Sequence, residues 1–294
     1  MAIDFEQAKR DLVWAIASPS LLNTDDDCVE PPHALLPGDV DAADLGCFLD
    51  QHAKHRVGRY FELLVLYYLQ RIRGVEIVAH GHQLRAAGRT LGELDFLFRD
   101  EAGRLVHWET AVKFYLRFDG GGLSLPEYIG PNAVDTFERK VSRLFDHQLK
   151  LPVTEFGDLG TRRAFVKGRI FYHVSSGDLT DHDERLSVDH LRGQWLYATE
   201  VDQFCASSEC CVFRLLQKPH WLAEEITGGS SDLLEERDQF ADLLCRHFAE
   251  SSAPVHAAAF GSSEHGQTEH SRLFVVSDAW PVRRPADARN RPSH

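Results

Sequence analysis

Hydrophobic positions recur along the chain with two different periods, and together these periods predict a mixed α/β protein. Residues 4–19 carry apolar side chains at helical spacing, and a second helical region begins near Asp41 and resumes over 53–71. Within it, the segment GRYFELLVLYYLQRI is apolar on all sides, so we expect a buried helix there.

Three apolar or alternating runs follow this helix and predict strands. They are VEIVAHGHQL at 75–84, LDFLFRD at 94–100 and GRLVHWETAVKFYLRF at 103–118. The segment AAGRTLGE predicts a turn region before the second strand, and DEAG predicts a tight turn before the third. The resulting order is helix, strand, strand, strand, with two short hairpin connections.

The second half of the chain predicts further helices and strands. PNAVDTFERKVSRLFDHQLKL at 131–151 predicts an amphipathic helix with Asn132 as its N-cap and Gln148 on its apolar stripe. AFVKGRIFYHV at 164–174 predicts a strand, and so do GQWLYATE, CCVFRLLQKPHW and SRLFVVSDAW nearer the end. A last helix is expected over 230–250.

These elements predict a mixed central sheet flanked by helices. We expect an N-terminal helical segment over 1–49, a core over 50–220 and a C-terminal α/β extension over 221–280 that packs on the core. The final residues, 281–294, are polar and rich in Arg and Pro, so we expect a disordered tail.

Composition narrows the classes of function. The net charge of −13 argues against a protein that coats nucleic acid through charge alone, although a local basic cleft remains compatible with it. No apolar run is long enough to span a membrane, and the N-terminal residues predict no signal peptide. The six cysteines show no CxxC spacing, so we expect free thiols and a cytoplasmic location.

Three ionisable residues lie within otherwise apolar strands and are the candidates for chemistry. Asp95 and Glu109 stand on strands joined by a hairpin, where opposite side chains come within roughly 5 Å of each other. Two carboxylates at that distance suit Mg²⁺ or Mn²⁺, which prefer oxygen ligands. Lys113 shares the strand face of Glu109 and is the candidate for positioning water or stabilising charge.

Simpler interpretations of these charges stay open. Glu109 and Lys113 could form a buried ion pair with no chemical role, and Glu62 could pair with Arg59 one helical turn earlier. Asp95 could cap a turn or pair with a nearby arginine.

The Asp strand GELDFLF and the following HWETAVK resemble the PD-(D/E)XK nuclease superfamily. This resemblance implies a restriction-endonuclease-like core over 50–220, with Asp95 and Glu109 as metal ligands, Glu62 as the helix acid and Gln148 as the glutamine of the next helix. The sequence departs from the pattern at Lys113, because three residues rather than one separate it from Glu109. Four strand steps are about 13 Å, against about 6.6 Å for two, so a direct role of Lys113 requires its long stem or a bulge.

Seven segments spread over nearly the whole chain are similar to the bacterial family named domain of unknown function (DUF) 1853. They are GRYFELL, GRTLGELDFLFRD, HWETAVKFYL, GPN…D…K…HQL, DHLRGQWL, KPHWLA and FVVSDAWP. The resemblance supplies no substrate.

The sequence therefore predicts a Mg²⁺-dependent nuclease that acts on DNA, or less readily on RNA. Asp95, Glu109, Lys113 and Glu62 would form the catalytic set, and Gln148, Lys140 and His147 would contact the substrate. One alternative is a catalytically inactive module of the same fold that binds nucleic acid or a protein partner. Another is a structural subunit of a larger complex, which would expose an apolar patch.

Overall fold

The computed structural model describes residues 4–52, 56–86, 89–120, 127–151, 156–157, 159–177, 183–208, 210, 212–225, 234–263 and 266–281. The tail expected over 281–294 lies outside the described residues from position 282 onward. The helices are α1 (Phe5–Ala17), α2 (Ala42–Asp50), α3 (Val57–Tyr67), α4 (Phe137–Asp146), α5 (Val201–Ser207) and α6 (Arg237–Glu250), with a π-helical turn η2 (Tyr68–Ile72) after α3 and a 3₁₀ turn η3 (Gln148–Lys150) after α4. The strands are β1 (Glu76–Ala86), β2 (Arg89–Arg99), β3 (Leu105–Phe118), β4 (Glu127–Ile129), β5 (Leu159–His173), β6 (Leu191–Tyr197), β7 (Val212–Leu215), β8 (Glu235–Glu236), β9 (Val255–Ser263) and β10 (Gly266–Val276).

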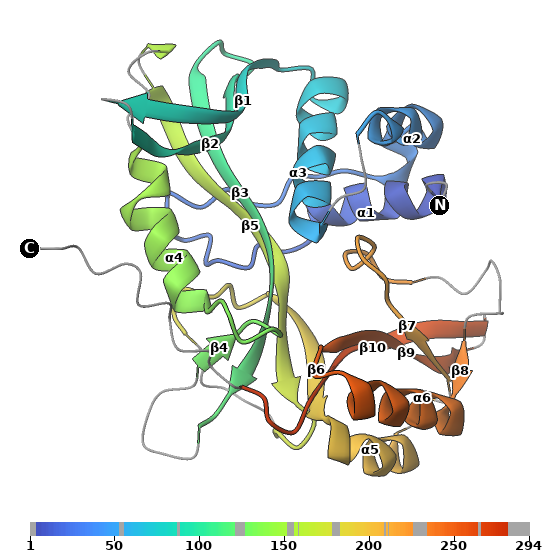
Figure 1. The fold of residues 1–294 in the computed structure, drawn as a ribbon. Helices are drawn as coiled ribbons and strands as arrows, with labels where there is room; N and C mark the ends of the chain where they lie inside the picture. Colours follow the sequence, from blue (N-terminus) through green and yellow to red (C-terminus); the bar gives the residue numbers. More distant parts are fainter. Residues whose placement is uncertain are drawn as a thin grey trace, which may run out of the picture.

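All ten strands belong to one mixed sheet, which confirms the predicted α/β class. The order is β1-β2-β3-β5-β6-β10-β9-β7-β8, with β4 paired to the free side of β3. Strands β1, β2 and β3 form the two predicted hairpins, whereas β5 and β6 run parallel to β3. The long strands β3 and β5 cross the molecule from the β1–β2 hairpin at one end to the C-terminal elements at the other (Figure 1).

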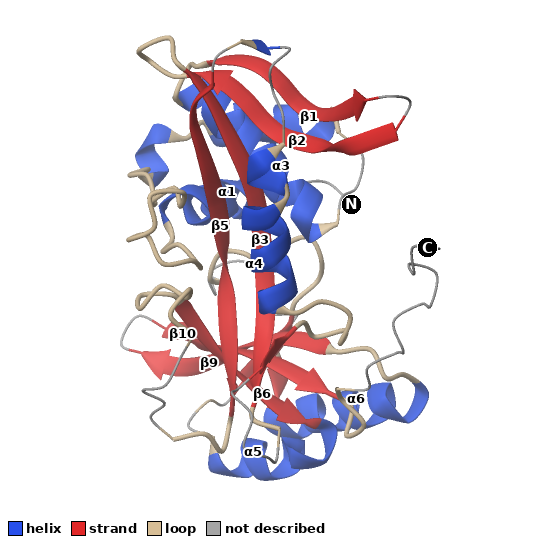
Figure 2. Cartoon of the chain, turned by 90° about the vertical axis from the view of Figure 1, so that its left-hand side faces the viewer, coloured by secondary structure: helices blue, strands red, loops and turns tan. Residues whose placement is uncertain are grey.

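Helices cover both faces of the central strands. Helices α1 to α3 pack against one face through a core that includes Phe96, Trp108 and Phe165. Helix α4 packs against the other face, where Tyr115 and Val166 contribute to a second core (Figure 2). Because side chains alternate along a strand, odd-numbered residues of β3 face α4 and even-numbered ones face α3.

The same sheet continues into the C-terminal part of the chain. Strand β10 pairs in parallel with β6 and in antiparallel fashion with β9, and β7 pairs with β9. Helices α5 and α6 cover this end through a third apolar cluster (Figure 1). The sequence patterns did not predict β9 or α5, because Ala-rich VHAAAFGSS and the short VDQFCAS carry little periodic signal.

Helix α4 begins later than its sequence predicted. The expected start near Asn132 is wrong, because Gly130–Asp135 forms a turn in which Ala133 has a positive φ of 54°. Thr136 is the N-cap instead, and its hydroxyl accepts a hydrogen bond from the backbone N–H of Arg139. Gln148 also lies beyond the α-helix, in η3, although it still faces the sheet.

No helix among the described residues combines the length and apolar character needed to cross a membrane.

Candidate active site

Asp95 and Glu109 lie together at the point where β2 separates from β3. The antiparallel register of these strands ends at the pair Phe96↔Trp108, and Asp95 and Glu109 are the next residue on each strand. Both face α4, because their neighbours Phe96 and Trp108 face the core on the α3 side. The backbone N–H of Thr110 donates to Oδ2 of Asp95 at 2.8 Å, which fixes the Asp95 carboxylate beside β3.

Glu109 is fully buried, and both of its carboxylate oxygens are hydrogen-bonded. His107 Nε2 lies 2.8 Å from Oε1, and the side-chain amide of Gln148 donates to Oε2 at 2.6 Å. Burial lowers the pKa of His107 to about 4, so the imidazole is neutral and offers a hydrogen bond rather than a charge to Glu109. Among the described residues, no arginine forms an ion pair with Asp95 or Glu109.

The two carboxyl groups carry strongly perturbed pKa values. Burial raises the pKa of Asp95 from 3.8 to about 7, and the nearby charge of Glu109 adds to this effect. Burial also raises the pKa of Glu109, from 4.5 to about 7, against the opposing influence of Lys140. The site therefore concentrates negative charge in a poorly solvated place, a feature that is common at functional sites.

Lys140 is the lysine that reaches this acid pair. It extends from α4, and its Nζ donates to Oε1 of Gln148 at 3.2 Å. Burial lowers the pKa of Lys140, Lys113 lowers it further, and the charges of Asp95 and Glu109 oppose that shift. A continuous chain of contacts thus runs from Lys140 through Gln148 to Glu109.

Lys113 is directed elsewhere. Its Nζ lies 2.6 Å from Oδ2 of Asp135, in an ion pair about one third exposed. The hydroxyl of Tyr115 contacts the same Asp135 oxygen at 3.4 Å. The four strand steps between Glu109 and Lys113 keep the two side chains apart, so they form no ion pair with each other.

The other predicted site residues, Glu62 and His147, do not contact the acid pair directly. Glu62 pairs with Arg59 at 2.8 Å, as the simpler interpretation of the sequence allowed. Glu62 is nevertheless close enough for its charge to raise the pKa of Asp95. His147 is exposed at the C-terminal end of α4, and none of the described residues forms a hydrogen bond or ion pair with its side chain.

Sequence reasoning missed two members of this neighbourhood. His107 contacts Glu109 directly, and its position two residues earlier on the same strand could have placed it on that face. Asp135, the partner of Lys113, carried no such signal, because it lies in a turn whose position depends on the packing of α4.

The donor set suits a divalent cation held by two carboxylates. The described residues contain no cluster of three or more His, Cys, Asp and Glu side chains arranged to hold a metal ion. Mg²⁺, however, usually takes only one or two protein carboxylates and completes its shell with water and phosphate. Oδ1 of Asp95 accepts no hydrogen bond from any described residue, so it is available as a ligand.

Comparison with known proteins gives one match. A model of the family described as "Domain of unknown function (DUF1853)" matches residues 10–276. Neither the comparison with curated proteins nor that with solved structures found a match. Because the family model covers most of the sequence, the chain belongs to the DUF1853 family.

Proposed function

We propose that this protein is a divalent-cation-dependent phosphodiesterase that cleaves DNA, or less readily RNA. The observation that carries the proposal is the pair formed by the partly buried Asp95 and the fully buried Glu109, because burial raises the pKa of each to about 7 and so makes their ionised forms costly without a cation. Lys140 is a cation whose charge lowers the pKa values of both carboxyl groups. A bound divalent cation would compensate the remaining charge.

Asp95 and Glu109 would hold Mg²⁺ or Mn²⁺, which supplies charge stabilisation and a water of lowered pKa. Asp95 would contribute Oδ1, which accepts no hydrogen bond from any described residue. Glu109 would contribute Oε2, which now accepts from the Gln148 amide, while His107 would hold Oε1 and the orientation of the carboxylate. Carboxylates that bind metal ions are usually held in orientation by a hydrogen bond of this kind.

Lys140 would take the role that the sequence assigned to Lys113. Its Nζ is linked to Glu109 through one glutamine side chain, so it can stabilise the charge that develops on a phosphoryl group at the acid pair. Lys113 would act on the substrate side, where it can exchange Asp135 for a phosphate. Glu62 would tune Asp95 through its charge.

The resemblance to PD-(D/E)XK nucleases supports the same proposal. An acid on a buried helix, an Asp on one strand, a Glu on the next and a glutamine after the following helix occur in that order in this chain. The departure concerns only the source of the lysine, which would come from α4 instead of β3.

A direct test uses the wild-type protein and a small phosphodiester. Bis(p-nitrophenyl) phosphate should be hydrolysed in the presence of Mn²⁺ and untouched in the presence of EDTA. A linear DNA substrate should be degraded under the same condition. Failure to hydrolyse either substrate with Mg²⁺ or Mn²⁺ would reject the enzymatic proposal.

A second candidate is a nuclease-like module that binds nucleic acid or a protein without cleaving. The observation in its favour is that hydrogen bonds hold both oxygens of Glu109 and that Asp135 holds Lys113. Titration with Mn²⁺ separates the two candidates, because a module in which the acid pair is closed binds no ion even when an oligonucleotide is present.

The pKa values also predict how metal binding depends on pH. The folded protein keeps protons on Asp95 and Glu109 up to about pH 7, whereas the unfolded chain releases them near 4, so these groups lower stability as pH rises through this window. A bound cation needs the deprotonated form. We therefore expect Mn²⁺ to raise the melting temperature clearly at about pH 8 and very little at about pH 5.5. An equal rise at both pH values in differential scanning fluorimetry would place the ion elsewhere.

A further inference from the structure

Strand β3 has a free edge immediately beside the acid pair. Its pairing with β2 ends at Trp108, and its pairing with β4 begins only at Leu116. The Thr110 N–H points to this side, since it donates to Asp95. Backbone groups of alternate residues point the same way, so the N–H and C=O groups of Val112 and Phe114 face the gap without a strand partner among the described residues.

A cavity of about 600 Å³ surrounds this free edge. Residues 112–115 of β3 form its floor, the turn 130–135 walls it on the α4 side, and residues 216–221 wall it on the other side. Pockets for small ligands span roughly 300–1,000 Å³, so the cavity is large enough to hold a ligand of that size.

Two lysines enter the cavity from opposite sides of the strand. The side chain of Lys113 lines the cavity on the α4 side. Lys218 contributes from the other side, where its Nζ lies 4.7 Å from the centre of the Trp221 ring. No carboxylate among the described residues pairs with Lys218, which is exposed. The edge of β3 is thus flanked by two lysines, of which Lys113 pairs with the cavity carboxylate Asp135. Such lysines can bind the phosphates of a nucleic acid.

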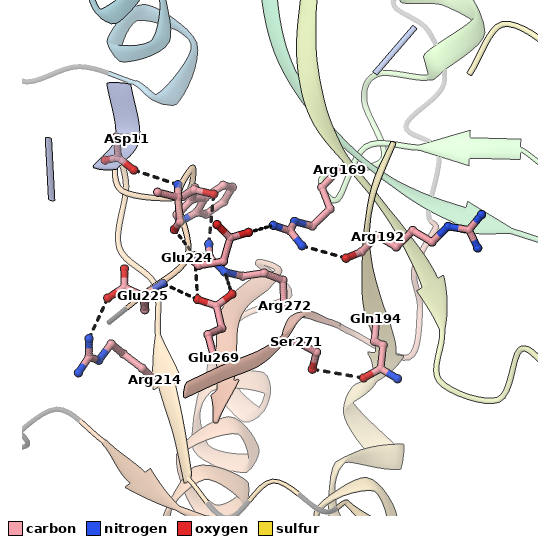
Figure 3. Close-up of polar contacts among 12 residues, drawn as sticks. Asp11, Arg169, Arg192, Gln194, Arg214, Glu224, Glu225, Glu269, Ser271 and Arg272 are labelled. Carbon is pink, nitrogen blue, oxygen red and sulfur yellow. Dashed lines mark hydrogen bonds and ion pairs between the residues drawn. The ribbon is translucent and has the colours of Figure 1, made fainter. Parts of the chain in front are cut away.

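The wall that carries Lys218 is held in place by a buried polar network. Asp11 of α1 accepts a hydrogen bond from His220 at 3.1 Å. It also accepts one from the backbone N–H of Ala223 at 3.0 Å (Figure 3). Arg272 of β10 donates to the carbonyl oxygens of Trp221 and Ala223 and pairs with Glu269 (Figure 3). These contacts fix the cavity wall to the sheet and to α1, so the cavity is formed before a ligand arrives.

We propose that this cavity is a subsite for single-stranded nucleic acid, through which the strand runs from the acid pair along the free edge of β3. The inference rests on the proposed function, because it extends the same site. Unpaired bases expose donors and acceptors that match the free backbone groups of Val112 and Phe114, whereas a duplex conceals them. Lys113 and Lys218 contact the phosphates on either side, and the apolar surface of Phe114 offers a platform for a base.

Binding of a fluorescein-labelled oligothymidylate, followed by anisotropy in EDTA, tests this subsite without cleavage. Lys218→Ala should weaken single-strand binding about tenfold at low salt and reduce the slope of log K against log salt by about 0.7. Asn132→Ala, a second exposed change in the same cavity, should also weaken binding. Arg246→Ala on α6 removes an exposed cation that does not line the cavity and should leave binding unchanged.

The outcomes separate the subsite from the enzymatic proposal. Hydrolysis of bis(p-nitrophenyl) phosphate by the wild type reports on the acid pair alone, because so small a diester does not extend into the cavity. The subsite would be overturned if both cavity variants bound the single strand as tightly as the wild type. It would also be overturned if a duplex of the same sequence bound as tightly as the single strand. An acidic peptide that binds through Lys218 where the oligonucleotide does not would likewise overturn it. If the wild type does not hydrolyse the diester, the enzymatic proposal is rejected and the cavity remains a binding subsite.

Discussion

Asp95→Asn should abolish metal-dependent cleavage and at the same time make the protein more stable at alkaline pH. The substitution removes a poorly solvated carboxylate whose pKa is raised by burial and by the charge of Glu109, while Asn Oδ1 can still accept the Thr110 N–H. We expect the cleavage rate to fall at least about a thousandfold, a loss of roughly 4 kcal/mol of transition-state stabilisation. The free energy of unfolding at about pH 8 should be about 1–3 kcal/mol higher than in the wild type, because a poorly solvated carboxylate no longer has to be ionised.

The two effects are measured separately, by initial rates of diester hydrolysis and by chemical denaturation. The stability gain should shrink at about pH 5, where the wild-type carboxyl groups are protonated in the folded state. Glu76→Gln is the matched control, since Glu76 is an exposed acid on the same sheet that forms a long ion pair with Arg99. A variant that is less stable than the wild type and still cleaves would show that Asp95 is a structural acid.

Lys140→Ala should reduce the turnover number far more than Lys113→Ala. Lys140 lies at the acid pair, whereas Lys113 is held by Asp135 in the neighbouring cavity. Loss of one positioned charge-stabilising group typically costs about 100- to 1,000-fold in turnover. Lys113→Ala should act mainly by raising KM, by about threefold to tenfold, because it would remove a substrate contact.

Steady-state kinetics on single-stranded DNA separate these effects. Lys150→Ala provides the control, because Lys150 lies in η3 close to the site but is largely exposed and pairs with the exposed Asp146. If Lys113→Ala costs more turnover than Lys140→Ala, then the strand lysine moves to the acid pair when substrate binds, and the assignment of Lys140 is wrong.

Local patterns in the sequence were sufficient to predict the centre of the fold. The strands that carry Asp95 and Glu109 alternate in the manner of a hairpin, and the tight turn between them fixes their register, so the two acids could be placed opposite each other. The buried helix α3 followed from its uniform apolar character.

The positions of the lysines could not be predicted in the same way. Lys113 lies on the face of Glu109, and nothing local indicates that Asp135, 22 residues later in the chain, would hold it. Lys140 reaches the acids only because α4 starts at Phe137 and packs on that face, and the helix start depends on a turn with a positive φ at Ala133. Tertiary contacts between helices and strands thus determine which lysine lies beside the acid pair.

The unpaired edge of β3 between β2 and β4 could not be predicted from the sequence either. Every residue of β3 fits a strand, and the apolar pattern alone does not reveal that its edge lacks a partner over Val112 and Phe114. The wall of the cavity is formed by residues more than a hundred positions later, which the network of Asp11 and Arg272 holds in place.

The most direct measurement is a crystal of the protein soaked in Mn²⁺ and recorded at a wavelength where manganese scatters anomalously. The account predicts one anomalous peak between Oδ1 of Asp95 and Oε2 of Glu109, within about 2.0–2.3 Å of both oxygens, with the Gln148 amide displaced. An acid pair that stays empty in the soaked crystal, with Gln148 still bonded to Glu109, would contradict it.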